Sequence, residues 1–147
     1  MALDFDWIIP GLAQGSYPKP LRAPFEQGFD VVVFCAMEAQ PKRLRPPEGK
    51  SYILFPMDDN EYVPVSMDDA VKLNELAATL AAHLRAGKKL LVTCWEGRNR
   101  SGLVNALTLM KAARMPAQKA IATVRQKRPS RDCLTNPMFE RYLLLQR

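Results

Sequence analysis

Residues 90–102, LLVTCWEGRNRSG, join an apolar run to a polar, glycine-bearing loop. The run Leu90–Thr93 has no polar alternation, which is typical of a strand buried on both faces of a sheet. The residues that follow the loop, Ser101–Ala113, predict a helix. Strand, loop and helix in this order can turn the backbone amides of the loop and the N-terminus of the helix toward one anion. The stretch therefore predicts a phosphate site at the C-terminal edge of a strand.

The side chains of this loop add a nucleophile and a cation. Cys94 would lie near a helix N-terminus and near Arg100, conditions that favour the nucleophilic thiolate form of a cysteine. Arg100 offers a planar fork of donors that fits two phosphate oxygens. Gly97 permits a tight turn, and the hydroxyl of Ser101 can donate to the thiolate. We expect catalytic roles for Cys94, Arg100 and Ser101, and a phosphate-binding role for the residues between them, Trp95, Glu96, Gly97, Arg98 and Asn99.

The rest of the chain alternates short apolar runs with helical periodicity. Strands are predicted at residues 7–9, 12–13, 31–36 and 51–56, and helices at 21–27, 66–87, 116–127 and from 136 nearly to Arg147. The firmest helix starts at Ser66, a capping residue three positions before a carboxylate. The alternation predicts an α/β domain around a mostly parallel sheet, with the C-terminal helices covering its faces. Sites in such sheets form at the C-terminal ends of the strands.

Length and composition set the class of protein. The 147 residues allow one domain, 1–147, and 48% hydrophobic and 24% charged residues are typical of a globular chain. The N-terminal segment carries two aspartates where a signal peptide needs basic residues, and no run approaches the roughly 20 apolar residues of a membrane span. Three irregularly spaced cysteines and one histidine disfavour disulfides or a zinc site. We expect a cytoplasmic monomer with reduced thiols, no transmembrane segment, no metal and no cofactor.

The net charge of +6 is concentrated in one segment, Lys111–Arg131, which holds seven basic residues and no acid. A basic balance favours anionic partners. Helical spacing nevertheless scatters these side chains around the helix axes. We therefore expect solvated helix faces here rather than a surface for a polyanion.

Several motifs together resemble the cysteine-dependent protein tyrosine phosphatases, specifically the compact dual-specificity branch. The loop matches the Cys-x5-Arg-Ser signature of that family, and further matches cover nearly the whole chain in the family's order: Ile9–Ser16, Phe55–Asp59, Arg128-Pro129, Asn136 and Phe139. The resemblance implies a dual-specificity-phosphatase-like α/β fold, with a central, mainly parallel sheet flanked by helices. It also implies hydrolysis of phosphate monoesters through a cysteinyl-phosphate intermediate.

The resemblance also implies a general acid in the segment Phe55–Asp59. In register with the family, the acid position falls on Asp59, 35 residues before Cys94. A carboxyl there would protonate the leaving oxygen and then deprotonate the attacking water. Asp58 remains the alternative, because a loop one residue longer or shorter exchanges the two.

One departure from the family lies directly before the nucleophile, where Thr93 replaces the usual histidine. A threonine hydroxyl can still bind a backbone group, and we interpret the change as tuning rather than loss of activity. The phosphotyrosine-clamping loop of the larger enzymes is also missing, which implies a shallower pocket.

The resemblance leads us to expect a phosphorylated protein as substrate, with phosphotyrosine first and phosphoserine or phosphothreonine next. A phosphoinositide or other polyanion, or an RNA 5′-phosphate, is the first alternative, and a phosphate-binding module without turnover is the second. Arg98 bears on this choice, since a guanidinium at the pocket mouth could attract a second phosphate. It could equally pair with Glu96 or point to solvent.

Overall fold

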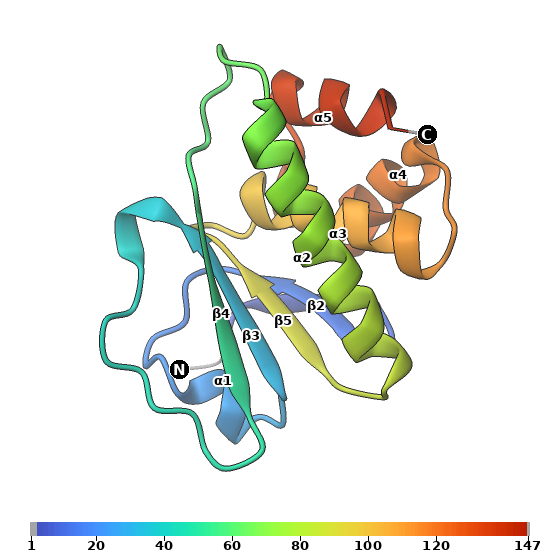
Figure 1. Cartoon of the computed structure of the whole chain (residues 1–147). Coiled ribbons are helices and arrows are strands. Elements are labelled where there is room, and N and C mark those ends of the chain that lie inside the picture. Colours follow the sequence, from blue (N-terminus) through green and yellow to red (C-terminus); the bar gives the residue numbers. More distant parts are fainter. Residues whose placement is uncertain (1–2, 147) are drawn as a thin grey trace.

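Five strands form one sheet in the computed structural model, which describes residues 3–146 (Figure 1). They are β1 (Phe5–Ile9), β2 (Leu12–Gly15), β3 (Val31–Ala36), β4 (Ser51–Met57) and β5 (Leu90–Thr93). Their order across the sheet is β1-β2-β5-β3-β4. Strands β2, β5, β3 and β4 are parallel, and only β1 is antiparallel to its neighbour. The predicted mainly parallel sheet is confirmed.

The helices lie close to their predicted places. They are α1 (Ala23–Glu26), α2 (Met67–Arg85), α3 (Arg100–Ala112), α4 (Ala117–Lys127) and α5 (Pro137–Leu144), with a 3₁₀ turn at Met37–Ala39. Helix α2 begins as expected, because the Ser66 hydroxyl accepts a hydrogen bond from the Asp69 amide at 3.1 Å. Helix α5 ends at Leu144, earlier than predicted, and Arg147 lies outside the described residues.

The helices cover the two faces of the sheet unequally, contrary to the expectation that the C-terminal helices would cover both. Helices α2 to α5 lie together on one side of the sheet, and α1 lies on the other (Figure 1). The second face is covered by α1, neighbouring aromatic residues and part of the loop before β4. The reason is the connection from β3 to β4, which carries a 3₁₀ turn and a loop but no α-helix.

The two central strands explain why the sequence showed no alternation. Val31, Val33 and Cys35 of β3 face the core beneath α2 and α3, whereas Val32 and Phe34 face the smaller core on the α1 side. All six residues of β3 are buried, and so are all four of β5. Both faces of these strands must therefore be apolar.

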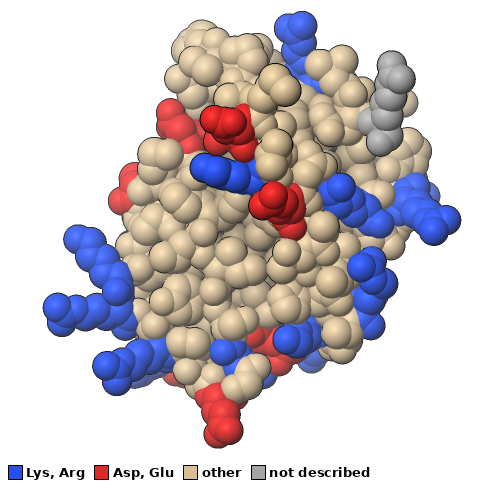
Figure 2. Space-filling view, in the orientation of Figure 1, with Lys and Arg blue, Asp and Glu red and all other residues tan. Residues whose placement is uncertain are grey.

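Charged groups are unevenly spread on the face that Figure 1 presents. Figure 2 shows a broad central area of this face without charged side chains, and most of its lysines and arginines lie near the rim.

In the part of the chain that the structure describes, no helix combines the length and the apolar character needed to cross a membrane.

Asp30 joins the N-terminal ends of three parallel strands. Its carboxylate accepts hydrogen bonds from the Lys50 ammonium at 2.6 Å and the Lys89 amide at 2.8 Å, next to β4 and β5 respectively. Its own carbonyl accepts from the Ser51 amide at 2.9 Å. The hydrogen bond from Lys50, with that from the Lys89 amide, lowers the pKa of Asp30 below its ordinary value.

We predict that Asp30→Asn lowers the free energy of unfolding by about 1 kcal/mol near neutral pH, since it weakens these charge-assisted bonds. Folding lowers the pKa of Asp30, so the ionised carboxylate contributes its full stabilisation of the folded state above the ordinary value of 3.8. This stabilisation is lost as the pH falls below that value. Urea denaturation of both proteins at neutral pH and at pH about 3 measures the difference. An unchanged difference at the lower pH would contradict this role of the carboxylate.

Candidate active site

The predicted phosphate loop, residues 94–99, joins β5 to α3 at the C-terminal edge of the sheet. Cys94, at the start of the loop, is 2% exposed, and its Sγ lies 3.2 Å from the Ser101 Oγ. A small cavity of about 110 Å³ opens beside it, lined by Glu38, Asp59, Cys94, Trp95, Glu96, Arg98, Asn99 and Arg100. The fold thus brings Cys94, Arg100 and Asp59 to one cavity.

The carbonyl groups of this loop are engaged by the surrounding protein. Six donors bind the five carbonyls of residues 95–99 at 2.8–3.3 Å: Tyr17 N to Trp95 O, Arg128 Nη2 to Glu96 O, Arg128 Nε and Gln14 Nε2 to Gly97 O, Leu134 N to Arg98 O, and Leu103 N to Asn99 O. The amides of residues 95–99 donate to no acceptor within residues 3–146. A loop whose carbonyls are held from outside and whose amides are unpaired is suited to bind an anion.

Arg128 holds much of this arrangement. Its side chain is fully buried, and it donates from Nε to Gly97 O at 2.8 Å and from Nη2 to Glu96 O at 3.1 Å. The same guanidinium pairs with Asp4 at 2.9 Å and Asp6 at 2.8 Å, both at β1. The expectation of a solvated side chain is wrong for Arg128, because the carbonyls and two carboxylates satisfy its charge inside the protein.

The pKa of Asp4 reflects this pairing. Burial by itself would raise the pKa, but hydrogen bonds from Arg128, Ser16 and Arg131 and the charge of Arg128 lower it to about 2. Asp4 is therefore ionised over the whole physiological range, and the ion pair with Arg128 persists there.

Gly97 is required by the shape of the loop. Its φ is +70°, and a Cβ on this residue would lie 2.6 Å from the Gly15 carbonyl and 2.7 Å from the Arg128 Nη2. Any other side chain would collide with these groups. Glycine is therefore needed at position 97 for two reasons: its backbone adopts a positive φ, as the expected tight turn requires, and there is no room for a side chain.

Arg100 is oriented by Glu38, a residue that the sequence did not single out. The Glu38 carboxylate accepts from Nη1 and, at 2.8 Å, from Nη2, and the Met57 carbonyl accepts from Nη1 at 3.1 Å. The hydrogen bond from Arg100 is the main reason why the pKa of Glu38 falls to about 2. A usable signal existed: Glu38 lies two residues after the end of β3, at the same sheet edge as Cys94.

These bonds leave one edge of the guanidinium free. The buried Nε has no hydrogen-bond partner among residues 3–146, and Nη2 has a second hydrogen beyond the one donated to Glu38. In a guanidinium the Nε–H and this Nη2–H lie side by side, so they can bind two oxygens of one phosphate.

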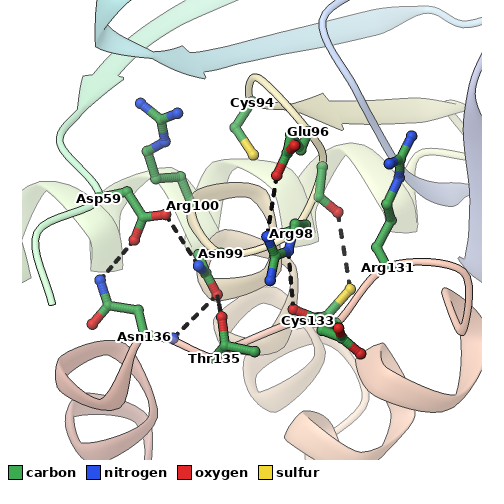
Figure 3. Close-up of polar contacts among 12 residues, drawn as sticks. Asp59, Cys94, Glu96, Arg98, Asn99, Arg100, Arg131, Cys133, Thr135 and Asn136 are labelled. Atoms are coloured by element: carbon green, nitrogen blue, oxygen red, sulfur yellow. Dashed lines mark hydrogen bonds and ion pairs between the residues drawn. The ribbon is translucent and has the colours of Figure 1, made fainter.

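Asp59, rather than Asp58, belongs to the cavity. Its Oδ2 accepts from Asn99 Nδ2 at 3.0 Å and its Oδ1 from Asn136 Nδ2 at 2.7 Å (Figure 3). Asp58 instead lines a separate pocket with Met57. The Asn99 side chain thus binds Asp59 rather than standing free for phosphate.

Arg98 and Glu96 form an ion pair at the mouth of the cavity. Arg98 Nη1 lies 3.2 Å from Glu96 Oε2, and its Nε donates to the Asp132 carbonyl at 3.3 Å (Figure 3). Of the expected alternatives for Arg98, the structure thus shows the pairing with Glu96. This pairing partly neutralises the charge of Arg98.

Thr93 and Trp95 flank Cys94 with different surroundings. Thr93 is fully buried, and its hydroxyl donates to the Val33 carbonyl at 2.8 Å. The hydroxyl thus binds a backbone group, as expected. Trp95 is 46% exposed and stacks on Tyr17, with the ring centroids 5.7 Å apart. Trp95 thus presents an aromatic surface at the cavity rim.

Comparisons with known proteins agree with this geometry. The family model "Dual specificity phosphatase, catalytic domain" matches residues 14–146. Human DUSP28 superposes with a TM-score of 0.78 at 26% identity, over 97% of this chain and 92% of that one. Tk-PTP in its active form gives a TM-score of 0.78 at 25% identity, over 98% and 95% of the two chains.

At 19% identity and a TM-score of 0.71, the tyrosine phosphatase OH1 from the Orf virus shares the fold, over 98% of this chain and 87% of that one. A search of curated proteins gives no match. The family match spans the sheet from β2 onward and the loop between Cys94 and Arg100. The chain therefore belongs to the dual specificity phosphatase family, and it is a protein tyrosine or dual-specificity phosphatase.

Proposed function

We propose that this protein hydrolyses phosphotyrosine, and also phosphoserine or phosphothreonine, in proteins through a phosphorylated Cys94. The observation that carries the proposal is the set of unpaired donors around Cys94. The cavity beside the Cys94 thiol is lined by Arg100, which has a free edge, and by four of the five loop residues with unpaired amides: Trp95, Glu96, Arg98 and Asn99. A phosphate dianion would satisfy these donors at once.

In the first step, the Cys94 thiolate attacks phosphorus and the bond from phosphorus to the leaving oxygen breaks. Asp59 gives its proton to that oxygen, so that the substrate leaves as a neutral alcohol or phenol. Arg100 and the loop amides bind the equatorial oxygens, where negative charge is held through the reaction.

In the second step, the Asp59 carboxylate takes a proton from water, whose oxygen attacks phosphorus. The bond between sulfur and phosphorus breaks, which releases inorganic phosphate and restores the thiolate. The Ser101 hydroxyl, 3.2 Å from the sulfur, can donate to the departing thiolate.

The rim favours a protein substrate over a polyanion. The cavity of about 110 Å³ accommodates a phosphate group, and the exposed Trp95 ring can contact the ring of a phosphotyrosine. The pairing of Arg98 with Glu96 gives no support to a second phosphate site. Hydrolysis of phosphoinositides or RNA 5′-phosphates in preference to phosphopeptides would contradict this part of the proposal.

A reducing compartment, such as the cytoplasm, also follows from the proposed chemistry. Cys94 must be a free thiol to attack phosphorus, and Cys35, Cys94 and Cys133 are all free in this structure. Thiols persist in the reducing cytosol.

We predict that Cys94→Ser abolishes hydrolysis of a phosphotyrosine peptide and leaves its binding largely intact. The serine hydroxyl is not ionised at neutral pH, whereas the amides and Arg100 still face the anion. Phosphate release and calorimetric titration of the peptide measure the two effects. Substantial turnover by the purified variant would exclude the covalent mechanism.

We predict that Asp59→Asn slows hydrolysis of substrates with a basic leaving oxygen by about 10²–10⁴-fold, because the proton donor is lost. The loss should be much smaller with para-nitrophenyl phosphate, whose leaving group needs no proton. Asp58→Asn is the matched control and should change little. Exchange of the two phenotypes would assign the acid to Asp58.

We predict that Glu38→Gln lowers kcat/KM for all phosphate monoesters by about 10-fold, since the free edge of Arg100 is no longer held in place. Unlike Asp59→Asn, this variant should show no dependence on the leaving group. Glu48→Gln removes the same charge from an exposed loop position and serves as the control. Equal activity of the two variants would show that Arg100 needs no such support.

A further inference from the structure

Two asparagine side chains hold the Asp59 carboxylate, one on each oxygen (Figure 3). Asn99 comes from the phosphate loop and directly precedes α3, and Asn136 directly precedes α5. The carboxylate therefore bridges two segments that lie 37 residues apart in the sequence.

The orientation of both amide groups is set by backbone donors. Asn99 Oδ1 accepts from the Thr135 amide at 2.7 Å and the Asn136 amide at 3.2 Å. Asn136 Oδ1 accepts from the amides of Met138 at 2.9 Å and Phe139 at 3.4 Å. Only a side-chain oxygen can accept these bonds, so each NH₂ group must face Asp59.

The segment that carries Asp59 has little other support. Residues 58–64, which follow β4, are all exposed. Within residues 3–146, the two bonds to Asp59 are the only hydrogen bonds that link this segment to the rest of the protein. Without them, the carboxyl would be free to leave the cavity.

We propose that Asn99 and Asn136 are positioning residues that hold Asp59 at the cavity where the leaving oxygen departs. This inference rests on the proposed role of Asp59 as the general acid and base. A proton donor must lie within about 3 Å of its acceptor, and a displacement of about 1 Å can cost 10²-fold in rate. Each carboxylate oxygen keeps a further lone pair beside the asparagine bond, so Asp59 can carry its proton while it is held.

Asn136→Asp separates positioning from helix capping. The new carboxylate can still accept from Met138 and Phe139, because aspartate is among the best N-cap residues. Toward Asp59, however, it presents an oxygen in place of a donor, and the two carboxylates repel each other. Asn136→Ser also keeps the cap, but its shorter side chain has no NH₂ group to reach Asp59 and adds no charge.

We predict that both variants lower kcat for phenyl phosphate about 10- to 100-fold, with a far smaller loss for para-nitrophenyl phosphate. The melting temperature should stay near that of the unmodified protein. Because Asn136 acts through Asp59, Asn136→Asp should cause no further loss in a protein that already carries Asp59→Asn.

The outcomes separate this inference from the proposed function. If Asp59→Asn does not alter the dependence on the leaving group, the proposed role of Asp59 fails. If Asp59→Asn alters it and both Asn136 variants behave like the unmodified protein, only the positioning role is wrong. The positioning role also fails if the Asn136 variants lose activity equally with both substrates, or lose more in the Asp59→Asn background.

Discussion

The buried charge of Arg128 is the constraint on which the shape of the site depends. A guanidinium with no solvent contact is tolerable only when its donors are all satisfied. Two of its partners are carbonyls of the phosphate loop, and the others are carboxylates at the first strand. The same bonds that satisfy Arg128 pull the loop carbonyls outward and so leave the loop amides for an anion.

The sheet collects the remaining parts at one edge. Strands β3, β4 and β5 are parallel, and the segments after their C-terminal ends carry Glu38, Asp59 and Cys94. Parallel strands end on the same side, so residues far apart in the chain meet there. Glu38, which orients Arg100, the proposed proton donor Asp59 and the Cys94 thiol thus come from the segments that follow three different strands.

Charges within the site are arranged in pairs that leave selected donors free. Glu38 uses one end of the Arg100 guanidinium and leaves its other edge open, and Glu96 occupies Arg98. The donors that remain can bind an anion without first breaking a strong ion pair. Such preorganisation lowers the cost of binding a phosphate group and of stabilising its transition state.

Local patterns in the sequence were sufficient to predict most of the secondary structure and the loop that carries Cys94 and Arg100. The apolar runs of β3 and β5 required burial on both faces, and Ser66 marked the start of α2, because these properties depend on neighbouring residues alone. The spacing of Cys94 and Arg100 likewise placed thiol and guanidinium at one loop. Local patterns could not predict that α2 to α5 would share one face of the sheet.

The tertiary structure decided the roles of Arg128, Glu38 and Asn99. From the sequence, Arg128 was expected to be solvated with the rest of its basic segment, Asn99 was expected to bind phosphate, and Glu38 was not singled out. Their partners lie 31 to 124 residues away in the chain. Whether a polar side chain is solvated or paired depends on groups that only the folded topology brings to it, and no local pattern records those distances.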